Sequence, residues 1–390
     1  MSWPMVKLGD LIIDDIGGVS FKREQFSSNG TPVVPKKAIS GNVLIDNDDL
    51  VYTPSDVANI YGKYFLDDSF LLTTFRDLVA SGPNLGRVCE INVGQSFLMA
   101  QGMYAFKLNE HVYPRYFCYF SAEQRFREQV LRSKVGSTQV HIRGSEFRSI
   151  QIPLPPLAEQ KRIAAILDKA DAIRRKRQQA IQLADDFLRA VFLDMFGDPV
   201  TNPKGWEVKP VGDLCDCIVP GRDKPKSFNG STPWITTNEL IHLGVTFKKE
   251  NYIGLTVDEI SEVKARVVRK KSVIMTCVGD LGVVSVAGED MVINQQLHAF
   301  LPSQEIAPSY LSFSLALQKG YMLKMASSTT LPYMNKTVCN SVPVMLSPKE
   351  MQEKFESLVA KVAAFKLKST DFSYEVAFQS ISQKAFRDEL

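Results

Sequence analysis

Apolar residues recur at intervals of three and four positions along two long stretches of this chain. The first stretch, Leu157 to Phe196, contains neither proline nor glycine; Pro155 and Pro156 precede it, and Gly197 follows it. Such punctuation is typical of helix ends. The second stretch starts at Pro348, and together they predict two long α-helices with apolar seams. The predicted seam residues are Ile163, Ile166, Ala170, Ile173, Ala180, Ala184, Phe187 and Val191, then Phe355, Leu358, Val362, Phe365, Phe372, Val376 and Phe386.

A helix of about 40 residues is roughly 60 Å long, more than a small β-rich domain can cover. We therefore expect the two helices to bury their seams against each other as one intramolecular coiled coil. If the globular parts lie at opposite ends, the pairing is antiparallel. On this interpretation Phe365→Asp loosens the pairing. The alternative is that each helix packs only on its own domain.

The rest of the sequence contains an internal repeat. Trp3 and the run Leu8-Gly9-Asp10-Leu11 are matched by Trp206 and Val211-Gly212-Asp213-Leu214, and further matches follow in the same order. They include Thr31-Pro32 with Thr232-Pro233, Gln101 with Gln295, Tyr104-Ala105-Phe106 with His298-Ala299-Phe300, and Ile152-Pro153-Leu154 with Val344-Met345-Leu346. An ordered series of this kind indicates a tandem duplication.

Each copy begins with a part rich in Gly, Pro, Thr and Val, whose short β-like runs are separated by turn residues. We predict an α+β protein with four segments: a β-rich module at 1–153, a spacer helix at 154–198, a second module at 199–346 and a second helix at 347–390. The duplication gives this arrangement an approximate two-fold repeat.

Composition narrows the class of protein. The 390 residues carry 46 Lys and Arg against 43 Asp and Glu, a net charge of +3, so a polybasic coat is excluded. Six scattered cysteines favour reduced thiols, and neither a signal peptide nor an apolar run of membrane-spanning length is found. We expect a soluble cytoplasmic chain without a membrane segment.

Catalytic signatures fail one by one. The sequence has no phosphate-binding glycine loop, no dinucleotide fingerprint, no zinc-protease motif and no nucleophile elbow. The four histidines stand apart, and Cys215 with Cys217 is the only close cysteine pair, which we interpret as incidental strand residues. We predict a binding protein with no catalytic, metal or cofactor site of its own.

Polar and basic residues gather at matching places of the two modules. Two similar modules on rigid helices suit duplex DNA, and Arg, Lys, Gln and Asn are the side chains that contact phosphates and base edges. The candidate DNA-binding residues are Lys36, Lys37, Arg132, Lys134, Ser137, Thr138, Gln139, His141 and Arg143 in the first module, and Arg222, Lys224, Lys226, Thr236, Thr237, Asn238, Lys324, Ser328 and Thr329 in the second. Differences between the copies suggest two different half-sites, and we expect a change at Asn238 to alter only the second. The run Arg174 to Arg177 either follows phosphates or is a solvated helix face.

The layout resembles the specificity (S, HsdS) subunit of type I restriction-modification systems, over essentially the whole chain. The strongest marker is Ile152-Pro153-Leu154-Pro155-Pro156-Leu157-Ala158-Glu159-Gln160, which is similar to the family's start of the first spacer helix. The opening Trp3 to Leu11 and the run from Phe192 to Pro199 are also family-like. The second junction, Leu346 to Gln352, matches this pattern less closely but keeps the glutamine, as Gln352.

The resemblance implies two target-recognition domains that each read one half of a bipartite site in double-stranded DNA, with the antiparallel coiled coil as a ruler between them. It also implies two methyltransferase subunits and restriction subunits as partners, which bring S-adenosylmethionine, ATP and Mg²⁺; this chain brings no cofactor. Two alternatives remain open: a single-chain nuclease or methyltransferase with degenerate motifs, and a coiled-coil scaffold or regulator that binds DNA without reading bases.

Overall fold

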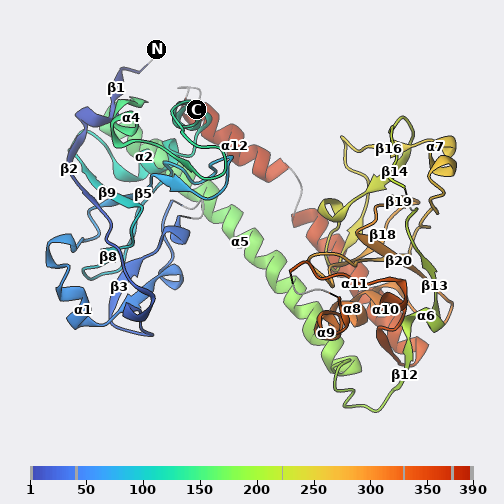
Figure 1. Cartoon of the computed structure of the whole chain (residues 1–390). Helices are drawn as coiled ribbons and strands as arrows, with labels where there is room; N and C mark the ends of the chain where they lie inside the picture. Colours follow the sequence, from blue (N-terminus) through green and yellow to red (C-terminus); the bar gives the residue numbers. More distant parts are fainter. Residues whose placement is uncertain (1–2, 40–42, 222, 328–329, 370–372, 387–390) are drawn as a thin grey trace. The chain divides into compact units, whose positions relative to one another are not determined.

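The computed structural model describes all residues except 1–2, 40–42, 222, 328–329, 370–372 and 387–390 (Figure 1). The chain divides into two compact units. Unit 1 comprises Met1–Lys176 and Phe372–Leu390, and unit 2 comprises Arg177–Asp371. Each unit combines a β-rich part with stretches of long helix, so this division does not test the four predicted segments, which stay a prediction.

Unit 1 contains two main sheets. An antiparallel sheet has the order β2 (Ile12–Gly17), β9 (Met103–Leu108), β5 (Leu71–Thr74), β7 (Val88–Cys89), and a second has the order β4 (Val51–Thr53), β3 (Thr31–Val34), β8 (Leu98–Met99). Strand β1 (Met5–Lys7) pairs with β11 (Gln151–Pro153), and β6 (Arg76–Asp77) pairs with β10 (Val140–His141). The shorter helices are α1 (Ser55–Asn59), α2 (Pro114–Phe120), α3 (Gln124–Arg132) and α4 (Gly144–Ser149).

Unit 2 repeats this plan. Its larger sheet has the order β13 (Cys215–Ile218), β20 (Leu297–Pro302), β17 (Val273–Thr276), β18 (Val284–Ala287), β15 (Val245–Thr246), and its smaller sheet the order β16 (Gly254–Leu255), β14 (Thr232–Ile235), β19 (Val292–Ile293). Strand β12 (Glu207–Pro210) pairs with β21 (Pro343–Leu346). The shorter helices are α6 (Val211–Leu214), α7 (Val257–Glu262), α8 (Pro308–Ala316), α9 (Lys319–Met325) and α10 (Lys336–Asn340).

The strand register confirms the tandem repeat. In unit 1, Ile16 of β2 is paired with Ala105 of β9, and in unit 2, Ile218 of β13 is paired with Ala299 of β20. Strands β3 and β14 each pair antiparallel on one side and parallel on the other. The repeated sequence motifs thus occupy equivalent places in one fold.

The first predicted long helix is α5 (Leu157–Phe196), whose first part belongs to unit 1 and whose remainder belongs to unit 2. The second is described as α11 (Lys349–Ser369) and α12 (Ser373–Ala385), on either side of residues 370–372. No helix in the described part of the chain is long and apolar enough to cross a membrane.

The long helices pair antiparallel within each unit. In unit 1, Ile163 of α5 shares a buried cluster with Ala385 of α12, and the Arg174 guanidinium lies 5.6 Å from the centroid of the Phe378 ring. In unit 2, Asp185 of α5 pairs with Lys366 of α11, and the rings of Phe192 and Phe355 have centroids 5.4 Å apart. Later residues of α5 meet earlier residues of the C-terminal helices in both units, so the predicted antiparallel pairing is confirmed.

Among the seam residues whose side chains are described, the prediction is wrong at three positions; Phe372 and Val376 lie outside that set. Ile173, Phe187 and Phe365 are each about half exposed, whereas Leu167 and Leu188, which the seam left out, are buried. A strict alternation of threes and fours assumes 3.5 residues a turn, but a straight helix has about 3.6, so the predicted stripe drifts round the surface. The seam also ignored the module surfaces against which the same helices pack.

Each junction between a module and its long helix is fastened by a buried glutamine. Gln160 accepts a hydrogen bond from the Tyr113 amide (2.8 Å) and donates to the carbonyls of His111 and Pro155 (both 2.9 Å). In unit 2, Gln352 accepts from the Ala307 amide (2.8 Å) and donates to the Ser347 carbonyl (2.8 Å) and the Glu305 carbonyl (3.3 Å). These contacts explain why the second junction has a glutamine although the rest of its sequence differs from the first.

We expect Gln160→Met to lower the free energy of unfolding by about 1–3 kcal/mol, because a buried amide and two carbonyls lose their partner. Denaturant unfolding of the full chain measures this change. Gln182→Met is the matched control, since Gln182 lies on an exposed face of α5. Equal losses for the two variants would contradict the fastening role of Gln160.

Candidate nucleic-acid interface

Three of the predicted DNA-binding residues line one hollow in unit 1. Lys36, Gln139 and His141 surround a space of about 380 Å³ together with Arg76 and Gln101. The hollow also borders Asp77, Leu78, Gly102 and Val140. Its rim therefore combines two cations, an imidazole and two amides, which are side chains suited to phosphates and base edges.

Local structure places these side chains on the hollow. The pairing of β6 with β10 sets Arg76 opposite His141. Backbone hydrogen bonds between Val135 and His141 (2.8 and 2.9 Å) close a loop that begins at Gly136, whose φ of 109° favours glycine. The predicted residues Ser137 and Thr138 form the exposed tip of this loop beside Gln139.

The Asp77 side chain fixes the backbone of the residues that follow it. Its buried carboxylate accepts hydrogen bonds from the amides of Val79 (3.0 Å) and Asn84 (2.8 Å). The Thr74 hydroxyl also donates to the Arg76 carbonyl (2.9 Å). These bonds hold the backbone of Arg76 while its side chain stays exposed.

The other predicted residues of the first module do not line this hollow. Lys37 is exposed on the 3₁₀ turn Lys36–Ala38, and Arg143 is exposed at the start of α4. Arg132 is exposed on α3 and lies 3.9 Å from Glu128. Lys134 donates to the Ala80 carbonyl (2.9 Å), so its ammonium stabilises the loop between β6 and β7.

The repeat places a different chemistry at the equivalent positions of unit 2. Val278 forms a β-bridge with Tyr333, and this pair corresponds to Arg76 paired with His141 in the first module. Tyr333 is 45% exposed, and Leu331, which corresponds to Gln139, is 58% exposed. Exposed apolar side chains here match polar ones in the first module, although Gln295 keeps the amide of Gln101.

The predicted residues of the second module are spread over several elements. Asn238 is exposed on the 3₁₀ turn Thr237–Glu239, which corresponds to the turn that carries Lys36. The Thr236 hydroxyl donates to Glu239 (2.6 Å) and caps this turn. Thr237, on the same turn, is partly buried, whereas Lys224, Lys226 (3.9 Å from Glu262) and Lys324 on α9 are exposed. Arg222, Ser328 and Thr329 lie outside the described residues.

The sequence interpretation missed Arg76, Gln101, Leu331 and Tyr333. The recurrence of Gln101 as Gln295 was a usable signal, because it fixed the repeat at the edge of the hollow. The other three could not be found from the sequence, since they join the site only through the pairing of β6 with β10 and of Val278 with Tyr333.

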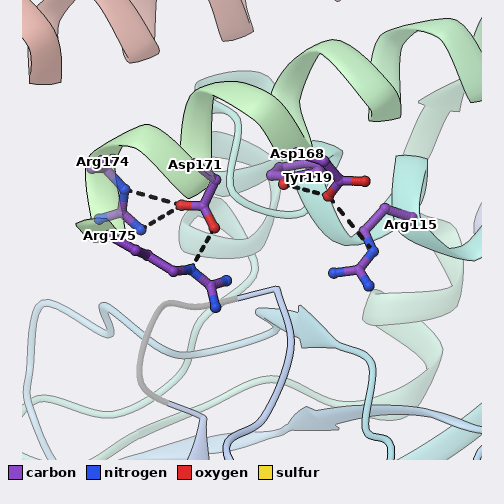
Figure 2. A network of polar contacts seen from close by, with 6 residues as sticks. All are labelled: Arg115, Tyr119, Asp168, Asp171, Arg174 and Arg175. Carbon is purple, nitrogen blue, oxygen red and sulfur yellow. Dashed lines mark hydrogen bonds and ion pairs between the residues drawn. The ribbon is translucent and has the colours of Figure 1, made fainter. Parts of the chain in front are cut away.

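The basic run on α5 is partly neutralised. Figure 2 shows the Asp171 carboxylate between Arg174 and Arg175, with closest N–O distances of 2.7 Å to each. Asp171 itself is buried. Arg174 and Arg175 are therefore held in an ion-pair network on the helix, and a phosphate contact by this run stays a prediction.

One turn earlier on α5, Asp168 ties the helix to its module. It accepts a hydrogen bond from the Tyr119 hydroxyl (2.8 Å) and lies 3.8 Å from Arg115, and both of these residues come from α2 (Figure 2). Arg115 also pairs with Glu90 at 2.7 Å. Polar contacts thus fix the start of α5 on the first module.

Among the described residues, no group of three or more His, Cys, Asp or Glu could hold a metal ion.

Comparison with known proteins gives consistent results. The chain is 23% identical to the MjaIX specificity subunit of a type I restriction enzyme from Methanocaldococcus jannaschii, over 64% of this chain and 62% of that protein. It is 26% identical to the MjaVIII specificity subunit from the same organism, over 47% of this chain and 43% of that protein. The chain thus spans less than two thirds of these curated relatives.

A solved structure has the same fold. The S subunit of a type I restriction-modification system from M. genitalium aligns over 99% of this chain and 96% of its own, with a TM-score of 0.58 and 14% identity. The family described as "Type I restriction modification DNA specificity domain" matches residues 2–183 and 203–370, one copy on each half of the duplication. The chain belongs to this type I restriction modification DNA specificity family.

Proposed function

We propose that the chain is the DNA-specificity subunit of a type I restriction-modification complex and recognises a bipartite site in double-stranded DNA. The observation that carries the proposal is the duplicated module with exchanged side chains. Arg76 and His141 in one copy correspond to Val278 and Tyr333 in the other, on the same strand pairing. A shared backbone with different side chains suits the reading of two different half-sites.

The chain acts in this proposal as a non-catalytic subunit. Its relatives are named as specificity subunits of restriction enzymes. We propose methyltransferase subunits, and restriction subunits where present, as its partners in the cytoplasm, and these supply S-adenosylmethionine, ATP and Mg²⁺. A net charge of only +3 fits a complex in which partners provide much of the contact with phosphates.

Modified-base sequencing tests the proposal directly. Cells without other adenine methylation express the partner methyltransferase with or without this chain. We expect a split, adenine-methylated motif that is present only when both proteins are expressed. The same sequencing gives both half-sites and the gap between them.

The second candidate function is a coiled-coil scaffold that binds DNA without reading bases. An active methyltransferase whose marks do not depend on this chain would favour the scaffold. DNA modification or cleavage by the purified chain alone would instead point to an enzyme.

A further inference from the structure

Three thiols and one imidazole meet inside unit 2. The Cys217 sulfur of β13 lies 2.7 Å from Nε2 of His298 in β20. Cys277, directly after β17, interacts through its thiol with His298 and with Cys339 of α10. The Met334 backbone joins the two cysteines, because its amide donates to the Cys277 carbonyl (2.9 Å) and its carbonyl accepts from the Cys339 thiol (3.7 Å). His298, Cys277 and Cys339 are buried, and Cys217 is partly exposed. The candidate DNA-binding residues described above include none of these four side chains.

The first module shows what the fold itself requires at these places. The strand register and the helix before the last strand equate Cys217 with Asp15, His298 with Tyr104, Cys277 with Phe75 and Cys339 with Phe147. There the Tyr104 hydroxyl donates to Asp15 (2.5 Å), and the Phe75 ring lies 4.5 Å from that of Tyr104 and 5.0 Å from that of Phe147, between centroids.

The same network of neighbours is therefore built twice with different chemistry. In unit 1 it is an aromatic stack that ends in a carboxylate, and in unit 2 all four positions carry sulfur or imidazole. Because the aromatic version already fills the fold, packing alone does not require thiols and a histidine at four equivalent positions.

Contacts within the cluster activate one thiol. The hydrogen bond with Cys339 and the neighbouring imidazole lower the pKa of Cys277 to about 6, although burial opposes this. Burial lowers the pKa of His298, but the thiols of Cys217 and Cys277 outweigh it and raise that pKa to about 9. These contacts favour the thiolate form of Cys277 and the protonated form of His298, and a thiolate is the reactive form of cysteine.

We propose that Cys277 and Cys339 form an oxidation site, at which hydrogen peroxide converts the two neighbouring thiols into a disulfide. The Cys277 thiolate attacks one peroxide oxygen, the O–O bond breaks, and the departing hydroxide takes a proton from the His298 imidazolium to become water. The Cys339 thiol then attacks the sulfur of the sulfenic acid at Cys277. An S–S bond forms, the S–O bond breaks and a second water leaves. Cys217 is partly exposed whereas the other three side chains are buried, so we expect peroxide to enter from the Cys217 side.

The position of the pair links its oxidation to the neighbouring surface. The Met334 amide donates to the Cys277 carbonyl (2.9 Å), and Val278 is bridged to Tyr333. A disulfide at Cys277 therefore ties down the segment that carries Tyr333. The effect on DNA recognition rests on the proposed function, whereas the disulfide itself does not.

The test uses the full chain, alone and in complex with its methyltransferase. After treatment with hydrogen peroxide at pH 7, peptide mass spectrometry is expected to find a Cys277–Cys339 cross-link, with the loss of two thiols that a disulfide reductant restores. Cys277→Ser and Cys339→Ser should each abolish the cross-link. Cys118→Ser is the matched control, because burial raises the pKa of that thiol in the first module.

His298 donates the proton in this step, and a pH profile separates this role from a structural one. His298→Gln is expected to slow disulfide formation about tenfold at pH 7 and less at pH 9, where a thiol of ordinary pKa is largely ionised. An equal loss at both values would contradict the role of the imidazole.

Three results would overturn the proposal. The first is that Cys89 and Cys118 are oxidised as readily as Cys277, and the second is that Cys277 is oxidised without forming a cross-link. The third is a stoichiometric zinc ion that the wild-type chain retains and Cys277→Ser loses. The last result would make the cluster a metal site. If the cross-link forms but no chain-dependent methylation is found in cells, the oxidation site stands and the proposed DNA function fails.

Discussion

Replacing Phe355 with alanine is expected to lower the free energy of unfolding of unit 2 by about 3–5 kcal/mol. Phe355 is fully buried on α11, and its ring meets those of Phe192, Phe196 and Phe313 edge to face, at centroid distances of 5.1–5.7 Å. Its removal leaves a cavity where α11, α5 and α8 come together. Denaturant unfolding of the full chain, followed by circular dichroism, measures the loss.

Phe365→Ala is the matched control, with the same substitution on the same helix. Phe365 is 49% exposed, so we expect a loss of less than about 1 kcal/mol. The heptad pattern instead predicts comparable losses, because it places both Phe355 and Phe365 in the seam and makes Phe365→Asp disruptive. Comparable losses for the two alanine variants would show that the seam, and not the structure, identifies the residues that hold the helices together.

Features with a local cause could be predicted from the sequence. A stretch of 40 residues without proline or glycine, bounded by both, has few alternatives to a helix, and α5 begins and ends within a few residues of the predicted limits. The duplication could be predicted from ordered sequence matches alone, and the register of β2 with β9 and of β13 with β20 confirms it.

Features that depend on long-range pairing could not be predicted. Arg76 and His141 are 65 positions apart in sequence, and only the pairing of β6 with β10 brings them to one hollow. The role of the Thr236 hydroxyl also depends on context, because a threonine that suits DNA also suits the cap of a 3₁₀ turn. Composition identified the loops that carry the polar residues but not which side chains converge.

The cysteines illustrate the same limit. Spacing alone makes Cys215 and Cys217 an unremarkable pair, and the sequence offers no reason to join Cys217 with His298, Cys277 and Cys339. Cys215 and Cys217 lie on the same face of β13, where Cys215 is buried in a hydrophobic cluster and Cys217 packs at the edge of that cluster beside His298 of β20. The repeat held the missing information, since each of the four replaces a residue that is already in contact in the first module.

Changing Arg76 to alanine is expected to relax recognition at one position of the first half-site and to leave the second half-site unchanged. Arg76 is exposed, its backbone is fixed by Thr74 and Asp77, and it lines the hollow with Lys36 and His141. An exposed guanidinium on a fixed backbone can form two hydrogen bonds with one guanine, a contact worth about 1–3 kcal/mol of discrimination against other bases. That corresponds to a fold-change of about 5 to 150 in relative affinity.

Competition binding by the assembled complex measures this change, with duplexes varied one base pair at a time in each half-site. Arg132→Ala is the matched control: Arg132 is an exposed arginine of the same module, but it lies beside Glu128 and does not line the hollow. Tyr333→Ala provides the reciprocal comparison, because its effect should be confined to the second half-site. If Arg76→Ala instead weakens binding equally for all sequences and lowers the salt dependence, Arg76 contacts a phosphate and the hollow does not read bases.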